Sequence, residues 1–121
     1  MSKQSYSKAK GRDGENAVVD YLRQRGYPAE RRRQTGAQDC GDVSGVPGWV
    51  IEVKAEKRLN LAGYMDELVA ERINAEKRYG SRQAGFVVCK RRGTQYPGEW
   101  YAVLTLDEMV NLLNTVNGIK V

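Results

Sequence analysis

"GDVSGVPGWVIEVKAEKR", residues 41–58, is the stretch of the sequence that decides the fold. Residues 49–55 at its centre are apolar enough to form a buried strand, in which side chains alternate between two faces. One of these faces is fully apolar: Trp49, Ile51, Val53 and Ala55. The other face carries Val50 but also Glu52 and Lys54, two charged side chains that a buried strand does not ordinarily hold.

The surrounding sequence predicts an α/β domain. Pro47-Gly48 is a tight turn that joins the central strand to a shorter one at 42–46. Further strands are expected at 28–34, 85–90 and 100–104, and helices precede, separate and follow these strands. The expected order is α-β-β-β-α-β-β-α, a central mixed sheet flanked by helices.

Three helices are expected. The first begins at a cap provided by Asp13, ends near Arg25 and has an apolar stripe: Val18, Val19 and Leu22. The second spans 61–79 before Gly80, with apolar residues at helical spacing: Leu61, Met65, Leu68, Val69 and Ile73. The third follows Thr105, which can form a capping box with Glu108.

The charge of the chain favours a polyanionic partner, of which nucleic acid is the commonest. The chain carries 20 Lys and Arg against 15 Asp and Glu, a net charge of +5 and a pI of about 9.3. It contains no His, which excludes serine triads and His-ligated zinc. Cys40 and Cys89 are isolated in sequence, so two reduced thiols are expected rather than a zinc ribbon or a disulfide.

The length predicts one domain, at residues 10–121, behind a flexible basic tail at 1–9. The first residues have no apolar core of the kind that a signal peptide needs, and no run is long enough to cross a bilayer. A cytoplasmic protein without a membrane partner is therefore expected.

Three acids and a lysine form a candidate site. Glu15 lies one turn before the apolar stripe of the first helix, on the side that faces the core. Asp42 and Glu52 lie in the two strands of one hairpin, so their carboxylates can converge. Mg²⁺ suits such a group because it prefers oxygen ligands, and Lys54 can orient or deprotonate a water and stabilise charge on a phosphate. The combination describes metal-dependent phosphodiester hydrolysis.

Each of these residues also has an ordinary structural explanation. A Glu-x-Lys pair on a strand is often a solvated ion pair, and Glu15 can be a first-turn acid favoured by the helix dipole. Asp39 is interpreted as a turn residue and Cys40 as a small loop residue rather than a ligand. The acids of the second helix are expected to pair with Arg72 or Lys57: Asp66, Glu67 and Glu71.

The motifs resemble a known superfamily. "GD" at 41–42 and "EVK" at 52–54 resemble the PD-(D/E)xK nuclease motif, with Gly41 in place of a proline that stiffens the approach. "KGRDGE" at 10–15, "RQTG" at 33–36 and "IEVK" at 51–54 are similar to the archaeal-type Holliday junction resolvases and their phage-encoded relatives. The resemblance covers roughly residues 10–105, and a phage source would place the protein in the host-cell cytoplasm.

The resemblance implies a restriction-endonuclease-like fold and specific roles. Asp42, Glu52 and the Val53 carbonyl would bind Mg²⁺, with Mn²⁺ as a substitute, and Glu15 would complete the acidic site. Lys54 would be the catalytic lysine, and Arg33 and Thr35 would contact DNA near the scissile phosphate. No small-molecule cofactor is implied. Further candidate DNA contacts are basic residues gathered elsewhere in the sequence: Lys10, Arg12, Arg31, Lys57, Lys90, Arg91 and Arg92.

The expected function is that of a structure-selective DNA endonuclease, which resolves four-way junctions by paired phosphodiester hydrolysis in DNA recombination and repair. A homodimer is expected, because resolution requires two symmetric nicks, and its interface is expected near Trp100, Tyr101 and the final helix. Two alternatives stay open: a nuclease of the same fold that cuts forks, flaps or duplex DNA, and a non-catalytic DNA-binding module.

Overall fold

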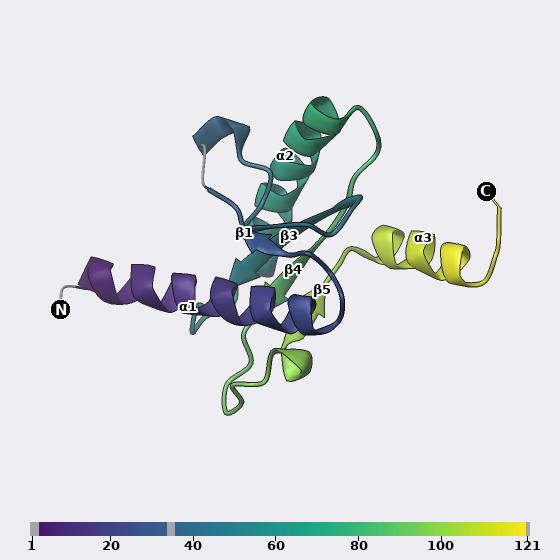
Figure 1. The fold of residues 1–121 in the computed structure, drawn as a ribbon. Helices are drawn as coiled ribbons and strands as arrows, with labels where there is room; N and C mark the ends of the chain where they lie inside the picture. Colours follow the sequence, from purple (N-terminus) through teal and green to yellow (C-terminus); the bar gives the residue numbers. More distant parts are fainter. Residues whose placement is uncertain (1–2, 34–35, 121) are drawn as a thin grey trace.

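The computed structural model of the chain describes residues 3–33 and 36–120 (Figure 1). Its helices are α1 (Lys3–Gln24), α2 (Leu61–Tyr79) and α3 (Leu106–Val116), with short 3-10 turns η1 (Gly36–Gln38) and η2 (Pro97–Glu99). Its strands are β1 (Glu30–Arg31), β2 (Val43–Ser44), β3 (Trp49–Lys54), β4 (Ala84–Cys89) and β5 (Tyr101–Val103). The expected α/β order is confirmed, with a five-stranded mixed sheet flanked by helices.

The sheet has the strand order β1-β2-β3-β4-β5, and β3 and β4 form its parallel centre. They run side by side from the pair Trp49 and Ala84 to the pair Lys54 and Cys89, and α2 connects them. The other neighbouring strands are antiparallel. Lys54 therefore stands at the carboxyl end of a parallel pair, the end at which α/β sheets commonly bind ligands.

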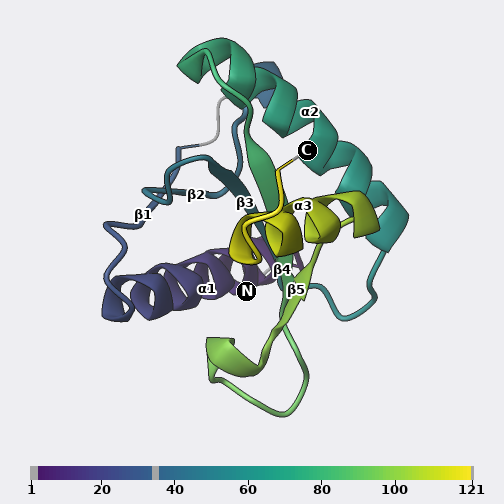
Figure 2. The same cartoon turned by 90° about the vertical axis from the view of Figure 1, so that its right-hand side faces the viewer.

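The alternation expected for β3 is confirmed. Ile51 packs in a core cluster with Val18 of α1, whereas Val50 packs in a second cluster with Leu68 of α2. Figure 2 shows the sheet between α1 on one side and α2 on the other. Because side chains alternate along a strand, the charged residues of β3 lie on the face that α2 covers.

Helix α1 begins at Lys3, well before the expected cap at Asp13, so most of the segment assigned to a basic tail is helical. Residues 3–9 include Lys3, Gln4, Lys8 and Ala9, which favour helix, and contain no Gly or Pro that would end it. The helix passes close to β3 at Gly14, where an added Cβ would lie 3.3 Å from the Cβ of Ala55. Glycine within the helix therefore permits close packing against the strand instead of ending the helix.

Strands β1 and β2 are shorter than the ranges 28–34 and 42–46 predicted for them. Helix α2 has the predicted bounds and ends at Gly80, which has a φ of 73°. Its buried face differs from the predicted stripe, because Leu61, Val69 and Ile73 are exposed. The side chains that it buries are Tyr64, Leu68, Glu71 and Ala75.

The C-terminal part of the chain was predicted partly correctly. The Thr105 hydroxyl accepts a hydrogen bond from the Glu108 amide (3.2 Å) and caps α3, but the Glu108 carboxylate binds Arg82 and Arg72 instead of closing the box. Trp100, expected at a dimer surface, is a core residue, and its indole N–H donates to the Thr94 carbonyl. None of the helices formed by the described residues combines the length and apolarity needed to cross a membrane.

Candidate functional site

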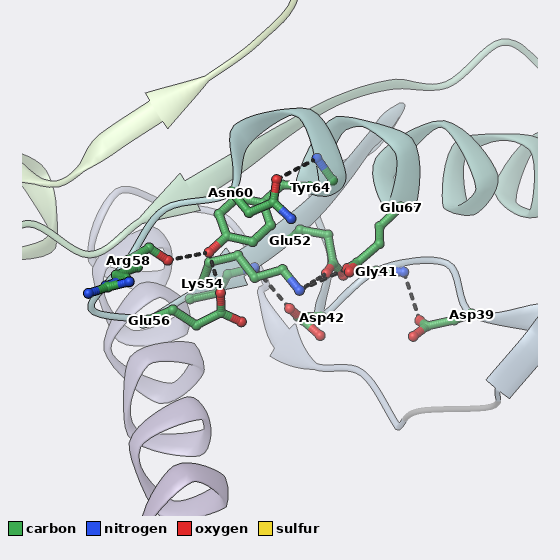
Figure 3. Close-up of polar contacts among 12 residues, drawn as sticks. Asp39, Gly41, Asp42, Glu52, Lys54, Glu56, Arg58, Asn60, Tyr64 and Glu67 are labelled. Carbon is green, nitrogen blue, oxygen red and sulfur yellow. Dashed lines mark hydrogen bonds and ion pairs between the residues drawn. The ribbon is translucent and has the colours of Figure 1, made fainter.

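A cleft of about 750 Å³ lies where α1, the β2–β3 hairpin and α2 meet. The structure brings all four residues of the predicted constellation to its lining: Glu15, Asp42, Glu52 and Lys54. Figure 3 shows Asp42, Glu52 and Lys54 pointing toward one another from the hairpin, with Glu67 approaching from α2.

Asp42 reaches the cleft through a β-bulge. Val43 pairs with Ile51, and the amide of Asp42 also donates to the Ile51 carbonyl (N···O 2.8 Å), so two residues of one strand face one residue of the other. Such bulges re-aim a side chain. The Oδ2 atom of Asp42 accepts a hydrogen bond from the Val53 amide (2.8 Å) at the end of β3.

Gly41 makes this entry possible. Its φ is +105°, and an added Cβ would lie 3.0 Å from the carbonyl oxygen of Ile51. A proline has a φ near −65° and cannot adopt this conformation. The backbone at position 41 therefore favours glycine and does not admit the proline of the motif that the sequence resembles.

The surroundings of Asp42 favour its neutral form. Burial raises the pKa of Asp42 to about 6, although the hydrogen bond from the Val53 amide lowers it. The charges of Glu15 and Asp39 raise it further. A nearby cation would reverse this balance, because it favours the carboxylate.

Glu52 and Glu71 meet across the interface between β3 and α2. The two residues are 5% and 6% exposed. Burial and the hydrogen bond with Glu71 raise the pKa of Glu52 far above its ordinary value, and burial also raises the pKa of Glu71. Two buried carboxylates that interact in this way share a proton at neutral pH unless a cation replaces that proton.

Lys54 is held by acids on both sides. Its Nζ lies 2.8 Å from Oε2 of Glu67 and 3.7 Å from Oε2 of Glu52, and it stands 5.2 Å from the centre of the Tyr64 ring. Burial lowers the pKa of Lys54, but the hydrogen bond to Glu67 and the charge of Glu52 raise it more, and the net pKa is above the ordinary value. Lys54 is therefore a cation at neutral pH, suited to hold negative charge rather than to remove a proton.

The arginines of β1 and of the loop that follows it contact different parts of the structure. Arg31, a candidate DNA contact, donates to Oε1 of Glu15 (3.1 Å). Arg32 donates to the Tyr79 hydroxyl (3.3 Å). Arg33 is exposed, and Thr35 lies outside the described residues. Arg31 is thus engaged with an acid of the cleft, whereas Arg32 is engaged with α2.

The loop before β2 is tied to α2. The Oδ1 atom of Asp39 accepts a hydrogen bond from the Gly41 amide (3.0 Å), which confirms Asp39 as a turn residue. The side-chain amide of Asn74 donates to the carbonyls of Ala37 and Asp39, both at 2.9 Å. Cys40 is buried in the core, and its thiol donates to the carbonyl of Gln38 (3.5 Å) within the same loop.

The acids could hold a metal ion. Glu52, Glu67 and Glu71 each offer a carboxylate oxygen, and these oxygens lie within 4.8 Å of one another. Within the described part of the chain, Oε1 of Glu52 and Oε2 of Glu71 are buried without a hydrogen-bond partner. Unpaired buried oxygens are costly, and a cation would satisfy both.

The expectation that Glu67 and Glu71 pair with Lys57 or Arg72 is wrong. Glu67 pairs with Lys54, and Glu71 is buried against Glu52. The spacing of Tyr64, Leu68, Glu71 and Ala75 could have revealed the second of these acids. It places Glu71 on a helix stripe that holds small and apolar residues, the same criterion that singled out Glu15.

A basic hollow of about 350 Å³ adjoins the acidic cleft and shares several lining residues with it. Five of the candidate DNA contacts line this hollow: Lys10, Lys57, Lys90, Arg91 and Arg92. The ammonium group of Lys90 also stands 5.6 Å from the centre of a Trp100 ring. Arg12 is exposed on α1. The basic groups thus gather beside the carboxylates although they come from three separate segments.

Comparison of the chain with protein-family models, curated proteins and solved structures finds no match. The cleft itself combines oxygen ligands for a hard cation, a fixed ammonium group and an adjoining basic surface. Carboxylates with a cation can activate water, and basic side chains can bind phosphate oxygens.

Proposed function

We propose that the chain is a Mg²⁺-dependent DNA endonuclease with a restriction-endonuclease-like fold, acting on four-way junctions. The observation that carries the proposal is the convergence of two buried carboxylates, Asp42 and Glu52, with Lys54 in one cleft beside a basic hollow. The ion pair of Lys54 with Glu67 has no structural need for the two buried carboxylates beside it, Asp42 and Glu52, whose pKa values are raised.

The residues of the cleft fit a divalent cation. Asp42 and Glu52 supply carboxylate oxygens, and Glu15 lines the same cleft. The N–H and C=O of one strand residue point to the same edge, so the Val53 carbonyl faces the side on which its amide meets Asp42. Bound Mg²⁺ supplies charge stabilisation at the phosphate and a water of lowered pKa. Mn²⁺, with similar ligand preferences, is the expected substitute.

Lys54 acts by charge in this proposal. Its ammonium group is fixed beside Glu52 and stabilises negative charge that develops on the scissile phosphate. Because its pKa is raised, Lys54 orients the attacking water and does not deprotonate it. Arg31 holds Glu15, another residue of the cleft lining, by a hydrogen bond.

The basic hollow supports the choice of DNA as substrate. Phosphate contacts position a nucleic acid without reading its bases, and a cluster of Lys and Arg side chains provides them. The choice of a four-way junction rests on the resemblance of "KGRDGE", "RQTG" and "IEVK" to the resolvases. A same-fold nuclease that cuts forks, flaps or duplex DNA is the alternative within enzymes.

The proposal includes a homodimer, since one cleft cuts one strand and a junction needs two opposed cuts. The second copy would pack on the exposed apolar side chains of α3, a helix that projects beyond β5 (Figure 1): Leu106, Val110, Leu113 and Val116. Sedimentation at micromolar concentration, with and without junction DNA, tests this part. A strict monomer in both conditions would contradict the resolvase and favour a nuclease that nicks one strand.

The decisive experiment is cleavage of a synthetic four-way junction beside the matching linear duplex, with Mg²⁺ and with EDTA. We expect Mg²⁺-dependent cutting of the junction and weak cutting of the duplex. Asp42→Asn and Glu52→Gln should abolish cutting and leave junction binding intact or tighter, because they reduce a negative charge that repels phosphate. Asp66→Asn, an exposed acid of α2 outside the cleft, is the matched control. Normal turnover by either cleft variant would remove that acid from the site, and equal cutting of both substrates would favour the generic nuclease.

A further inference from the structure

Helix α2 contributes two acids to the cleft that the resolvase motif does not include. Glu67 and Glu71 are four residues apart, so both side chains lie on one side of the helix. Their carboxylates and that of Glu52 offer oxygens within 4.8 Å of one another. This group does not include Asp42, which binds the Val53 amide elsewhere in the same cleft.

A second observation points to a ligand at this group. Oε1 of Glu52 and Oε2 of Glu71 are the two carboxylate oxygens, within the described residues, that are buried without any hydrogen-bond donor. The residues that carry them are 5% and 6% exposed. The other oxygen of Glu52 lies 3.7 Å from the Lys54 ammonium. Buried polar atoms are normally satisfied, and unpaired oxygens on two neighbouring carboxylates can be satisfied together by a cation, a shared proton or a bridging water.

Glu67 differs from the other two acids because its side chain is 54% exposed. Its carboxylate lies 2.8 Å from the Lys54 ammonium. Ion pairs of exposed side chains contribute little free energy, so a divalent cation can replace Lys54 as the partner of Glu67 at low cost. Hard cations take carboxylate oxygens and keep several waters, so two fixed carboxylates and one exchangeable carboxylate are a sufficient protein contribution.

We propose that the cleft holds two divalent cations that share Glu52. The first position is the one assigned above to Asp42, Glu52 and the Val53 carbonyl, and the second is formed by Glu52, Glu71 and Glu67. The inference rests on the proposed nuclease function. Two cations at neighbouring positions can stabilise both the entering and the leaving oxygen of a phosphodiester, which a single cation at the first position does less completely.

The second position also explains why Glu67 holds Lys54. When Glu67 turns to the cation, the Lys54 ammonium loses its closest partner and faces the cleft beside Glu52. Glu67 is thus a positioning residue that keeps Lys54 in place until the second position is filled. Its replacement should weaken binding of one cation without removing the first position.

Counting bound Mn²⁺ tests the inference. The full chain is titrated with Mn²⁺ in the absence of DNA, and free Mn²⁺ is measured by its electron paramagnetic resonance signal. The wild type should bind two ions. Glu71→Gln should bind one ion. Glu67→Gln should bind two ions, and the Kd of the weaker ion should rise about tenfold. A tenfold change corresponds to roughly 1.4 kcal/mol, the cost expected for the loss of one charged ligand. Asp66→Asn should give two ions with unchanged Kd values. Circular dichroism checks that each variant is folded, and Glu67→Gln removes an exposed group whose loss does not threaten the fold.

The possible results separate this inference from the function. One ion in the wild type, or two in Glu71→Gln, would overturn the second position, and the Glu52–Glu71 pair would then simply share a proton. If Asp42→Asn loses cleavage while Glu71→Gln keeps two ions, the nuclease stands and the inference fails. If the wild type binds Mn²⁺ but cuts no DNA in Mg²⁺, the proposed function fails whatever the number of ions.

Discussion

Replacement of Asp42 by asparagine should stabilise the metal-free protein at alkaline pH. Burial raises the pKa of Asp42 from 3.8 to about 6, only partly offset by the Val53 hydrogen bond. The folded state therefore binds a proton more tightly than the unfolded state, and the free energy of unfolding falls as the pH rises between these two values. Above pH 6 the full penalty applies, and a pKa difference of about two units corresponds to about 3 kcal/mol.

Asparagine removes the charge but keeps an oxygen that can accept the hydrogen bond from the Val53 amide. Urea unfolding in EDTA should therefore show a higher midpoint for Asp42→Asn than for wild type at pH 8, and nearly equal midpoints at pH 4. With a slope of about 2 kcal/mol per molar urea, 3 kcal/mol moves the midpoint by about 1.5 M. The buried Trp100 provides the fluorescence signal.

Mg²⁺ should reverse the order of the two proteins. A ligand at a thousandfold excess over its Kd stabilises the folded state by about 4.1 kcal/mol, which exceeds the penalty of about 3 kcal/mol. The gain from a cation at the Asp42 position is expected for wild type and not for Asp42→Asn. Asp66→Asn makes the same chemical change on an exposed side chain and should show neither effect. Equal midpoints of wild type and Asp42→Asn at pH 8 in EDTA, or a difference that does not change with pH, would refute the account of Asp42 as a carboxylate whose charged form is disfavoured by burial.

Three further outcomes are expected. Lys54→Ala should bind junction DNA and cut it about a hundredfold to a thousandfold more slowly, as measured by single-turnover cleavage, because a fixed positive charge at the phosphate is lost; wild-type cleavage would exclude this role. The double variant Arg91→Ala with Arg92→Ala should lower the slope of log affinity against log salt by about 2 in a fluorescence-anisotropy titration if both arginines contact phosphates, and an unchanged slope would show that they do not. Gly41→Ala should lower the free energy of unfolding by about 1–3 kcal/mol in urea, because its backbone conformation is strained for any side chain with a Cβ, and an unchanged midpoint would show that the bulge can relax.

The order of the elements could be predicted because local signals determine it. The alternation of side chains in β3 separates an apolar face from a charged one, and the apolar face packs against α1 in the structure. Gly80 ends α2 because its left-handed conformation favours glycine, and the Thr105 hydroxyl caps α3 through a contact of three residues. Such features depend on neighbours along the chain, which the sequence displays directly.

The start of α1 and the acids of α2 depend on tertiary contacts, which a local pattern does not contain. The cap predicted at Asp13 was a reasonable local signal, but favourable residues before it extend the helix to Lys3. The stripe chosen for α2 counted large apolar side chains, and the structure exposes Val69 and Ile73 on the other side. The buried side of α2 faces charged residues of β3, so a polar residue, Glu71, is what that surface accommodates.

The acidic cleft and the basic hollow separate the site of DNA cleavage from the surface that binds the DNA backbone. Among the described residues, the cleft is lined by seven acids and three lysines, although the whole chain has a net charge of +5. An acidic cleft repels a phosphate unless cations neutralise it, whereas the adjoining hollow attracts phosphates without any cation. DNA binding should therefore persist in EDTA and weaken with salt, and cutting should require divalent ions. Because one surface holds the backbone and another admits the scissile phosphate only after cations enter, the loss of a cleft carboxylate should remove cutting and strengthen binding together.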